Sequence, residues 1–399
     1  MGLLLSLTLA LTPSFAAIKA GSACTKAGRI SVSAGIQFKC IKKNKKLVWQ
    51  KIGPVKPVTP TPSATTTPTP VLTPTPTPTN DVQPIPTVSP IPLPSVEKTP
   101  TGFGDLIENY RGIPMAVWNE AQKLANSGTE KTNFDIEIGP KTKLQAEVSS
   151  PIIYLKRASR LWSNYAQPTT TKAFLYNYTD LSWVQEKNRN LGGSWHKPEE
   201  LADNCKSATD CNSFGGAFNG MGQLFIGVSN EVKPLWNLGW VRGNYYHEYT
   251  HTVQYTQLNA PANVKLPCWF AEGQPQVIGQ SLGFENFIDY GKSRASWVKQ
   301  PAGVLGDYNP ESILRFYELT GAAGNGICNQ NVRSRVYDIG YFTVEALSSI
   351  KGIQASMDLV GRVGKGNSFE SSFLEIYGVT WKEAAPVLAR VVSKIYLES

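Results

Sequence analysis

The chain has 399 residues, of which 41% are hydrophobic, enough for a sizeable core and for more than one domain. The formal net charge is +9, but residues 17–56 contain ten Lys or Arg and no Asp or Glu. The remainder is close to neutral. The charge of the residues outside 17–56 therefore indicates no preference for an anionic partner, and we expect no nucleic acid among the partners of the protein.

The first residues are predicted to be an export signal. Residues 1–16 are apolar and uncharged, and Ser14 and Ala16 are the small residues expected before a cut at Ala17. No Lys or Arg precedes the apolar run, which leaves open a start further upstream or a short anchor. A span is disfavoured because Pro13 interrupts the run and about 20 apolar residues are needed to cross a bilayer. We expect a secreted, extracellular protein without a membrane span in its mature form.

Export makes the six cysteines candidates for disulfides. None stands in a Cys-x-x-Cys pair, so a cysteine zinc site has little support. Six cysteines allow 15 sets of pairings, and the domain layout favours one of them. Its members are Cys24–Cys40, Cys205–Cys211 and Cys268–Cys328.

Residues 17–53 are predicted to form a small basic module bracketed by Cys24 and Cys40, with short strands indicated by alternating β-forming residues. The segment resembles the small basic modules with bracketing cysteines at the N-termini of many exported actinobacterial proteins. One interpretation is electrostatic retention on an anionic cell-wall polymer through residues 17–56. The other is a solvated stub that precedes a linker.

Residues 54–100 are the predicted linker. The stretch from Gly53 to Pro100 holds 15 of the 28 prolines, with Thr and Ser between them. Such a composition cannot build a core and favours an extended, polyproline-like spacer.

Residues 101–399 form the predicted working domain, with strand signals that fade after Trp240 and helices that follow, which indicates an α+β fold. The first elements are indicated by helix punctuation, by apolar alternation and by a glycine-rich turn before an apolar run. They are a helix at 114–128, strands at 134–139 and 172–178, and a turn and strand within 215–228.

The stretch 245–255, YYHEYTHTVQY, contains two of the three histidines. His247 and His251 stand four apart, so on a helix they are neighbours on one face and both imidazoles can reach one ion. Glu248 leans to the side of that face, where it can take a proton from metal-bound water. No proline interrupts residues 240–258, which favours the helix that this arrangement needs.

A catalytic zinc also needs a third protein ligand and an open position. Glu272 stands in the apolar segment CWFAEGQPQVIGQ (268–280), where an unpaired carboxylate would be costly. Proline is tolerated in the first turn of a helix. Because Pro275 follows Glu272 closely, we expect Glu272 to project from a helix start.

With H-E-x-x-H followed by W-F-x-E-G about twenty residues later, the chain resembles the gluzincin clan of zinc metallopeptidases, which includes thermolysin-like enzymes and zinc aminopeptidases. Residues 337–352, YDIGYFTVEALSSIKG, are similar to the Tyr-x-x-Gly helix of aminopeptidase-type members, and residues 367–384 resemble the helical tail of many exported members. The resemblance implies a thermolysin-like domain, with a mixed sheet followed by a helical subdomain, that hydrolyses peptide bonds.

The same resemblance implies a role for each matching residue. His247, His251 and Glu272 would bind Zn2+. Glu248 would act as general base and then as general acid, and Tyr337 would stabilise the oxyanion. From the residues alone, Tyr337 also fits an aromatic packed at a helix start.

Two features depart from the family. Only GGAFNGMG (215–222) stands where aminopeptidase-type members have the strand that grips the free amine of the substrate, and no histidine follows His251. The leading hypothesis is an exported zinc metallopeptidase. The alternatives are a cell-surface binding protein with a degenerate metallopeptidase-like scaffold and a zinc hydrolase of non-peptide substrates.

Three further polar residues are candidates for a place near the site. His196, in GGSWHKPEE, is expected in a surface loop. Gln254 and Gln276 each lie one turn from a predicted ligand. Both positions suit a partner that orients a ligand, and both equally suit an ordinary polar helix position.

Overall fold

The computed structural model describes residues 22–23, 30–33, 36–43, 46–54, 97–145, 150–191, 197–211, 213–218, 221–229, 238–321 and 332–398. The chain divides into two compact units, residues 1–89 and 90–399. The predicted signal and nearly all of the predicted linker lie outside the described residues. No helix in the described ranges is both long enough and apolar enough to cross a membrane.

The first unit contains a three-stranded antiparallel sheet, as the alternating residues predict. Its strands are β1 (Ile30–Ser33), β2 (Ile36–Lys43) and β3 (Lys46–Pro54). Phe38 and Cys40 of β2 and Trp49 of β3 are buried in one cluster. The five lysines described on these two strands are all exposed, so the basic charge of the unit faces solvent: Lys39, Lys42, Lys43, Lys46 and Lys51.

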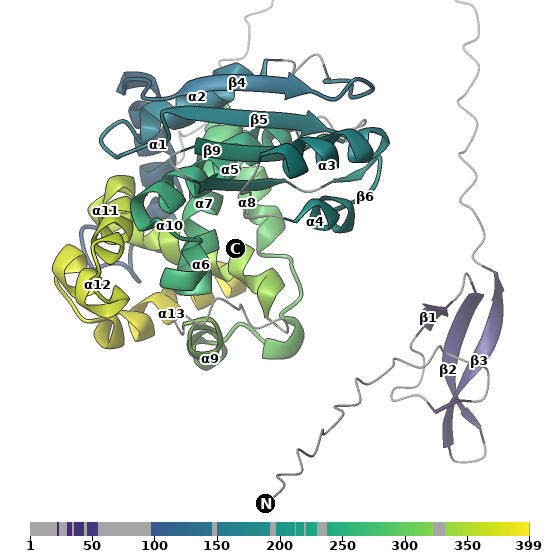
Figure 1. The fold of residues 1–399 in the computed structure, drawn as a ribbon. Helices are drawn as coiled ribbons and strands as arrows, with labels where there is room; N and C mark the ends of the chain where they lie inside the picture. Colours follow the sequence, from purple (N-terminus) through teal and green to yellow (C-terminus); the bar gives the residue numbers. More distant parts are fainter. Residues whose placement is uncertain are drawn as a thin grey trace, which may run out of the picture. The chain divides into compact units, whose positions relative to one another are not determined.

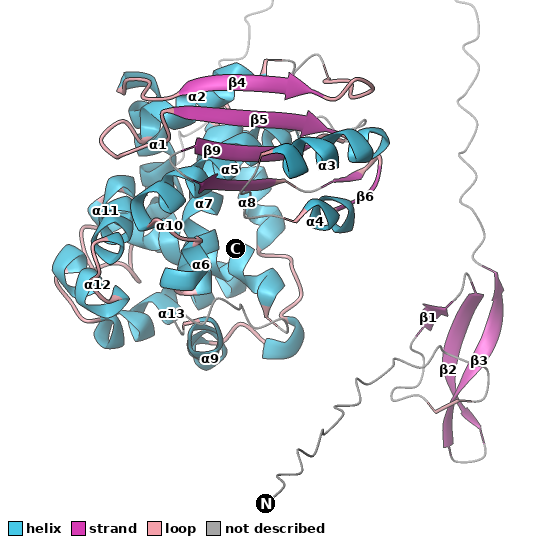
Figure 2. Ribbon diagram, in the orientation of Figure 1, coloured by secondary structure: helices cyan, strands magenta, loops and turns pink. Residues whose placement is uncertain are grey.

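The first α-helix of the second unit is α1 (Ile113–Ser127), and the unit contains a four-stranded mixed sheet (Figure 2). The sheet has the order β4-β5-β9-β8, in which the first three strands are parallel and β8 is the antiparallel edge strand. The strands are β4 (Asn133–Ile138), β5 (Thr170–Tyr176), β8 (Phe214–Phe218) and β9 (Met221–Gly227). The predicted turn and single strand within 215–228 is therefore a pair of antiparallel strands.

Both faces of the sheet are covered by helices (Figure 1). Ala173 and Leu175 of β5 belong to the main core, which also contains residues of α1, α2 (Pro151–Leu161) and the helical half. The alternate residues Phe174 and Tyr176 belong to a second cluster with Val184 of α3 (Leu181–Asn190) and Leu201 of α4 (Pro198–Asp203). Because side chains alternate along a strand, each face of β5 is packed into its own apolar layer.

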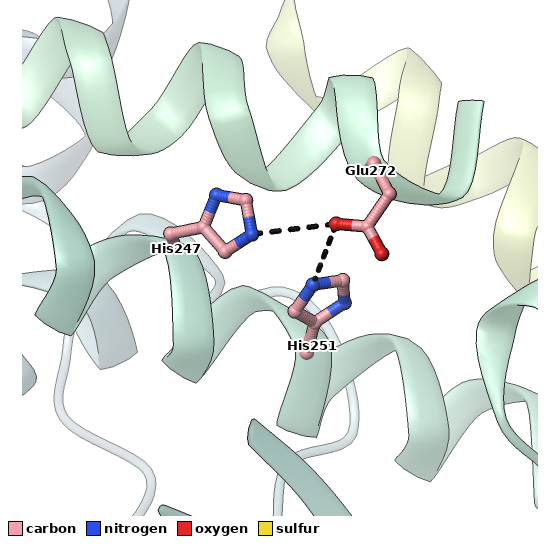
Figure 3. A group of neighbouring side chains, drawn as sticks. All are labelled: His247, His251 and Glu272. Atoms are coloured by element: carbon pink, nitrogen blue, oxygen red, sulfur yellow. Dashed lines mark ion pairs between the residues drawn. The ribbon is translucent and has the colours of Figure 1, made fainter. Parts of the chain in front are cut away.

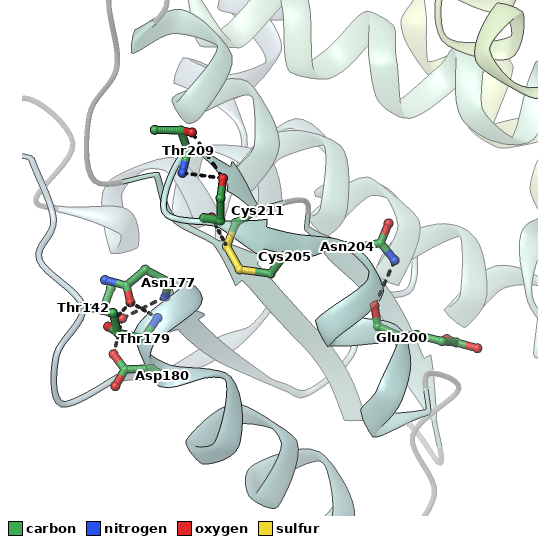
Figure 4. Close-up of a disulfide and its surroundings, with 10 residues drawn as sticks. Thr142, Asn177, Thr179, Asp180, Glu200, Asn204, Cys205, Thr209 and Cys211 are labelled. Carbon is green, nitrogen blue, oxygen red and sulfur yellow. Dashed lines mark hydrogen bonds between the residues drawn. A yellow bond between two sulfur atoms is a disulfide. The ribbon is translucent and has the colours of Figure 1, made fainter. Parts of the chain in front are cut away.

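The disulfide predicted between Cys205 and Cys211 is confirmed, and it joins the short strands β6 (Cys205–Ser207) and β7 (Asp210–Cys211) (Figure 4). Cys40 and Cys268 are also disulfide-bonded. Their predicted partners, Cys24 and Cys328, lie outside the described residues, so those two pairings stay predictions.

After residue 238 the described residues form helices, as expected for the second half. They are α5 (Leu238–Leu258), α6 (Ala262–Lys265), α7 (Cys268–Gly283), α8 (Phe287–Trp297), α9 (Pro310–Thr320), α10 (Ile339–Lys351), α11 (Ile353–Gly364), α12 (Phe369–Tyr377) and α13 (Trp381–Glu398). Helix α7 packs against α1, α5 and α10 and is the central helix of this half. The molecule thus combines a mixed sheet with a helical half.

One prediction about α7 is wrong. The helix begins at Cys268, directly after the extended Pro267, whose carbonyl accepts the N–H of Ala271 at 2.9 Å. Pro275 therefore lies in the interior of the helix, and Glu272 projects from its second turn. An interior proline removes one backbone hydrogen bond from a helix. The carbonyl that loses its partner in this way needs a donor from another part of the fold.

Candidate metal centre

Helix α5 carries His247 and His251 on one face. It is 21 residues long and uninterrupted by proline, which confirms the helix predicted from the four-residue spacing. The two imidazole rings have centroids 4.9 Å apart. The spacing of these histidines follows from helix geometry alone, since residues four apart are neighbours on the helix surface.

Glu272 of α7 faces both imidazoles (Figure 3). Its Oε2 atom lies 3.5 Å from His247 Nε2 and 3.3 Å from His251 Nε2. The ligand atoms of the three residues all lie within 4.8 Å of one another, so the group could hold a metal ion. Two imidazole nitrogens and one carboxylate oxygen form a donor set found at metal centres that keep one coordination position open.

Two glycines allow α7 to approach α5 closely. A Cβ atom on Gly243 would lie 2.9 Å from the carbonyl oxygen of Gly279, and one on Gly279 would lie 3.0 Å from the carbonyl oxygen of Gly243. Gly243 stands one turn before His247, so it belongs to the same face of α5. The close approach of the two backbones brings α7, which carries Glu272, directly against the helix that carries the histidines. Neither glycine was predicted from the sequence to contact the other helix.

The three side chains are partly accessible to solvent. Their exposed fractions are 11% for His247, 12% for His251 and 23% for Glu272. Glu272 is the one residue of α7 that is not buried. Solvent can thus contact part of each of the three side chains, and a catalytic centre requires access of this kind.

The charges of the group are strongly coupled. Burial alone would lower the pKa of His251, but the Glu272 carboxylate outweighs burial and raises this pKa to about 9. Burial alone would raise the pKa of Glu272, but the charge of His251 and hydrogen bonds from both imidazoles hold it below its ordinary value. Glu272 is therefore ionised at neutral pH and available as an anionic ligand.

Glu248 lies beside the group and is 7% exposed. Burial raises its pKa, although the imidazoles of His247 and His251 oppose this shift. The backbone of Glu248 is in contact with edge strand β8, because a Cβ atom on Gly215 would collide with the Glu248 carbonyl. A buried carboxylate with a raised pKa next to a metal position suits a group that first accepts and then donates a proton.

Tyr337 lies near His247. It ends the short helix Arg333–Tyr337, and its ring centroid is 6.2 Å from that of His247. The junction with α10 is fixed by Asp338, which accepts the N–H of Ile339 at 2.8 Å and pairs with Arg335 at 2.8 Å. Gly340 allows α10 to touch the carbonyl of Trp269 on α7, so Tyr337 is held at the edge of the site.

The remaining predicted candidates differ in whether they contact a candidate ligand. Gln254 contacts a ligand, with Oε1 2.8 Å from His251 Nδ1. Gln276 is buried, and among the described residues it makes no hydrogen bond to a ligand. His196 lies outside the described residues.

Sequence reasoning missed Tyr255. Its ring centroid lies 6.4 Å from that of His251, and burial together with the Glu272 and Glu248 carboxylates raises its pKa. The signal was present, because Tyr255 continues the four-residue spacing of His247 and His251 by one more turn.

Comparisons with protein-family models, with curated proteins and with solved structures gave no match.

Proposed function

We propose that the protein is an exported zinc metallopeptidase of the gluzincin type. One observation carries this proposal: His247, His251 and Glu272, selected from the sequence as zinc ligands, have their ligand atoms within 4.8 Å of one another. The donor set is that of catalytic zinc sites. The resemblance of the H-E-x-x-H and W-F-x-E-G segments to gluzincins supports zinc and peptide hydrolysis.

When bound, zinc supplies Lewis-acid polarisation and lowers the pKa of a water molecule. The chain performs the remaining steps. Glu248 accepts a proton from the attacking water and delivers it to the leaving amine. Its raised pKa allows it to hold that proton between the two steps. Tyr337 donates its hydroxyl proton in a hydrogen bond to the developing oxyanion.

The position of β8 supports a peptide as the substrate. This strand lies directly against α5 at Gly215, next to Glu248. Within the described residues it pairs only with β9 and is the edge strand of the sheet. An extended peptide could add to such an edge as a further strand and place its own backbone beside the site.

We also propose that the basic unit retains the enzyme on an anionic cell-wall polymer. The five exposed lysines on β2 and β3 are spread along two neighbouring strands, and residues 17–56 contain no acidic residue. Attraction between this surface and an anionic polymer should weaken as salt screens it. The test is binding of residues 17–56 to isolated cell walls at several salt concentrations. If the segment does not bind at low salt, or binds equally at all salt concentrations, the stub interpretation is supported.

The experiment that tests the enzymatic proposal combines metal analysis with substrate screening. Purified wild-type protein should contain about one zinc per chain, and His247→Ala should contain almost none. Wild type should also cleave members of a mixed peptide library and lose that activity with a chelator. If both proteins contain equal, near-zero amounts of zinc, the proposal that the protein is a zinc enzyme is wrong. Bound zinc with cleavage of esters but not of peptides would identify a hydrolase of other substrates.

A further inference from the structure

The Nδ1 atom of His251 points away from the ligand group and meets the Gln254 side chain, with Oε1 at 2.8 Å. The Nε2 atom of Gln254 has two acceptors, the Ala271 carbonyl at 3.1 Å and Gln274 Oε1 at 2.8 Å. Gln254 and Gln274 are 0% and 1% exposed. Because these groups are buried, the orientation of each amide is determined by its protein partners.

The direction of the hydrogen bonds can be derived from the far end of this network. The Ile353 carbonyl can only accept, so Ser356 Oγ donates to it at 2.6 Å. Ser356 Oγ then accepts from Gln274 Nε2 at 2.7 Å, which turns Gln274 Oε1 toward Gln254. This order agrees with the Ala271 carbonyl, which also requires the Nε2 atom of Gln254.

The consequence reaches the candidate ligand. With its Nε2 atom committed to two acceptors, Gln254 presents Oε1 to His251, and an amide oxygen can only accept. His251 Nδ1 must therefore carry a proton. The lone pair of the neutral ring is then on Nε2, the atom that faces Glu272 at 3.3 Å.

The interior proline of α7 explains why the Ala271 carbonyl is free to take part. In a regular helix this carbonyl would accept the N–H of residue 275, and Pro275 has no N–H. A buried carbonyl needs another donor, and Gln254 provides it. The proline that is unfavourable for α7 alone thus creates an attachment point for a residue of α5.

We infer that Gln254 is a positioning residue that holds His251 with Nδ1 protonated and Nε2 directed at the metal, anchored to the carbonyl that Pro275 leaves free. This inference rests on the proposed metal centre. It distinguishes the two histidines, because His247 has no such partner at Nδ1 among the described residues. Partners of this kind typically change metal affinity by about 10–100-fold.

The test measures zinc affinity by competition with a chelator for wild type, Gln254→Leu and Pro275→Ala. Gln254→Leu should weaken zinc binding about 10–100-fold. Pro275→Ala should weaken it less, because the restored N–H competes for the Ala271 carbonyl while Gln274 still holds the amide. The matched control is Gln280→Leu, since Gln280 is a buried glutamine of α7 that accepts a hydrogen bond from Ser293 Oγ, away from the ligands. Its zinc affinity should equal that of wild type.

A spectroscopic measurement separates orientation from general loosening of the fold. In the cobalt(II)-substituted protein, the Nδ1 proton of His251 should give a shifted proton NMR signal that exchanges slowly with water. The chain has three histidines, so few such signals arise. Gln254→Leu should lose this signal or make it exchange rapidly, while Gln280→Leu should keep it.

The outcomes are distinguishable. If wild type binds zinc but Gln254→Leu binds it within about twofold and keeps the slowly exchanging proton, the positioning role is wrong and the metal centre stands. If wild type binds no zinc, the metal centre and the positioning role are both wrong. If Gln254→Leu fails to fold, the zinc affinity of Pro275→Ala tests the positioning role instead. An affinity equal to that of wild type would contradict the proposed anchor at the Ala271 carbonyl.

Discussion

Helices α5 and α7 supply the candidate ligands in different ways. On α5, the two histidines are brought together by the turn of a single helix. On α7, Glu272 faces them across a helix–helix interface in which the two backbones approach closely at Gly243 and Gly279. The first arrangement is local and can be inferred from spacing, whereas the second depends on tertiary packing. Changes at the histidines or at Glu248 should therefore alter chemistry with little effect on the fold, and changes at the contacts that α7 makes with its neighbours should alter both.

The largest effect is expected for Glu248→Gln on α5. The amide has the shape of the carboxylate but cannot carry the proton, so kcat should fall by about 10²–10⁴. Glu248 is not a ligand, so zinc content should match wild type. Parallel metal analysis and peptide hydrolysis check this. A variant with full activity would remove Glu248 from its proposed role.

Tyr337→Phe should have the next largest effect. Loss of one oxyanion donor typically lowers kcat by about 10²–10³. The ring remains beside His247, so zinc content and thermal stability should change little. Steady-state kinetics with zinc analysis and a melting curve provide the measurement. If kcat falls by less than about threefold, Tyr337 is a packing residue, and Tyr255 becomes the next hydroxyl to test.

Asp338 precedes α10, which packs against α7, and it should make the stability of the protein depend on pH. Burial raises its pKa from 3.8 to about 6 against Arg335, with the hydroxyls of Tyr308 and Tyr396 as its other titratable neighbours. The folded protein holds the Asp338 proton more tightly than the unfolded chain does. Its contribution to stability is therefore full below about pH 4 and is lost as pH rises through about 6.

Asp338→Asn cannot ionise and isolates this contribution. Between pH 4 and pH 7, metal-free wild type should lose up to about 3 kcal/mol of unfolding free energy relative to the variant, at ~1.4 kcal/mol for each pKa unit. Urea unfolding of both proteins at several pH values gives the difference. Parallel pH profiles would show that Asp338 ionises in the folded protein at its ordinary pKa.

The contrast between α5 and α7 also explains which parts of the molecule could be predicted. The strands at β4 and β5, helix α1 and the His247–His251 pair follow from local periodicity, and their predicted bounds lie within two residues of the structure. Glu272 could be selected because an acid in an apolar segment needs a cation.

The start of α7 could not be placed because the rule that disfavours interior proline is local. The hydrogen bond that compensates Pro275 comes from Gln254, which is 21 residues earlier in the sequence. The pairing of Gly243 with Gly279 was missed for a similar reason. A glycine shows in the sequence that space is available, and only the fold shows which backbone occupies it.

The smallest predicted effect tests that backbone contact directly. In Gly279→Val, the new Cβ would lie 3.0 Å from the Gly243 carbonyl and 3.3 Å from His247 Cβ, and the further methyl groups would have no space between the helices. Overpacking of this kind costs about 1–3 kcal/mol. Because α7 must move away from α5, zinc affinity should fall along with stability.

Gly291→Val is the matched control, since Gly291 also lies inside a helix, α8, and a Cβ there meets nothing within 4 Å. Both variants place a β-branched residue in a helix, so their difference isolates the contact between α5 and α7. Urea unfolding of the metal-free proteins and chelator competition with zinc give the two quantities. If Gly279→Val loses stability but binds zinc as tightly as Gly291→Val, the distance from Glu272 to the histidines does not depend on the glycine contact. The position of Glu272 would then have to be maintained by the other neighbours of α7, beginning with α10 at Gly273 and Gly340.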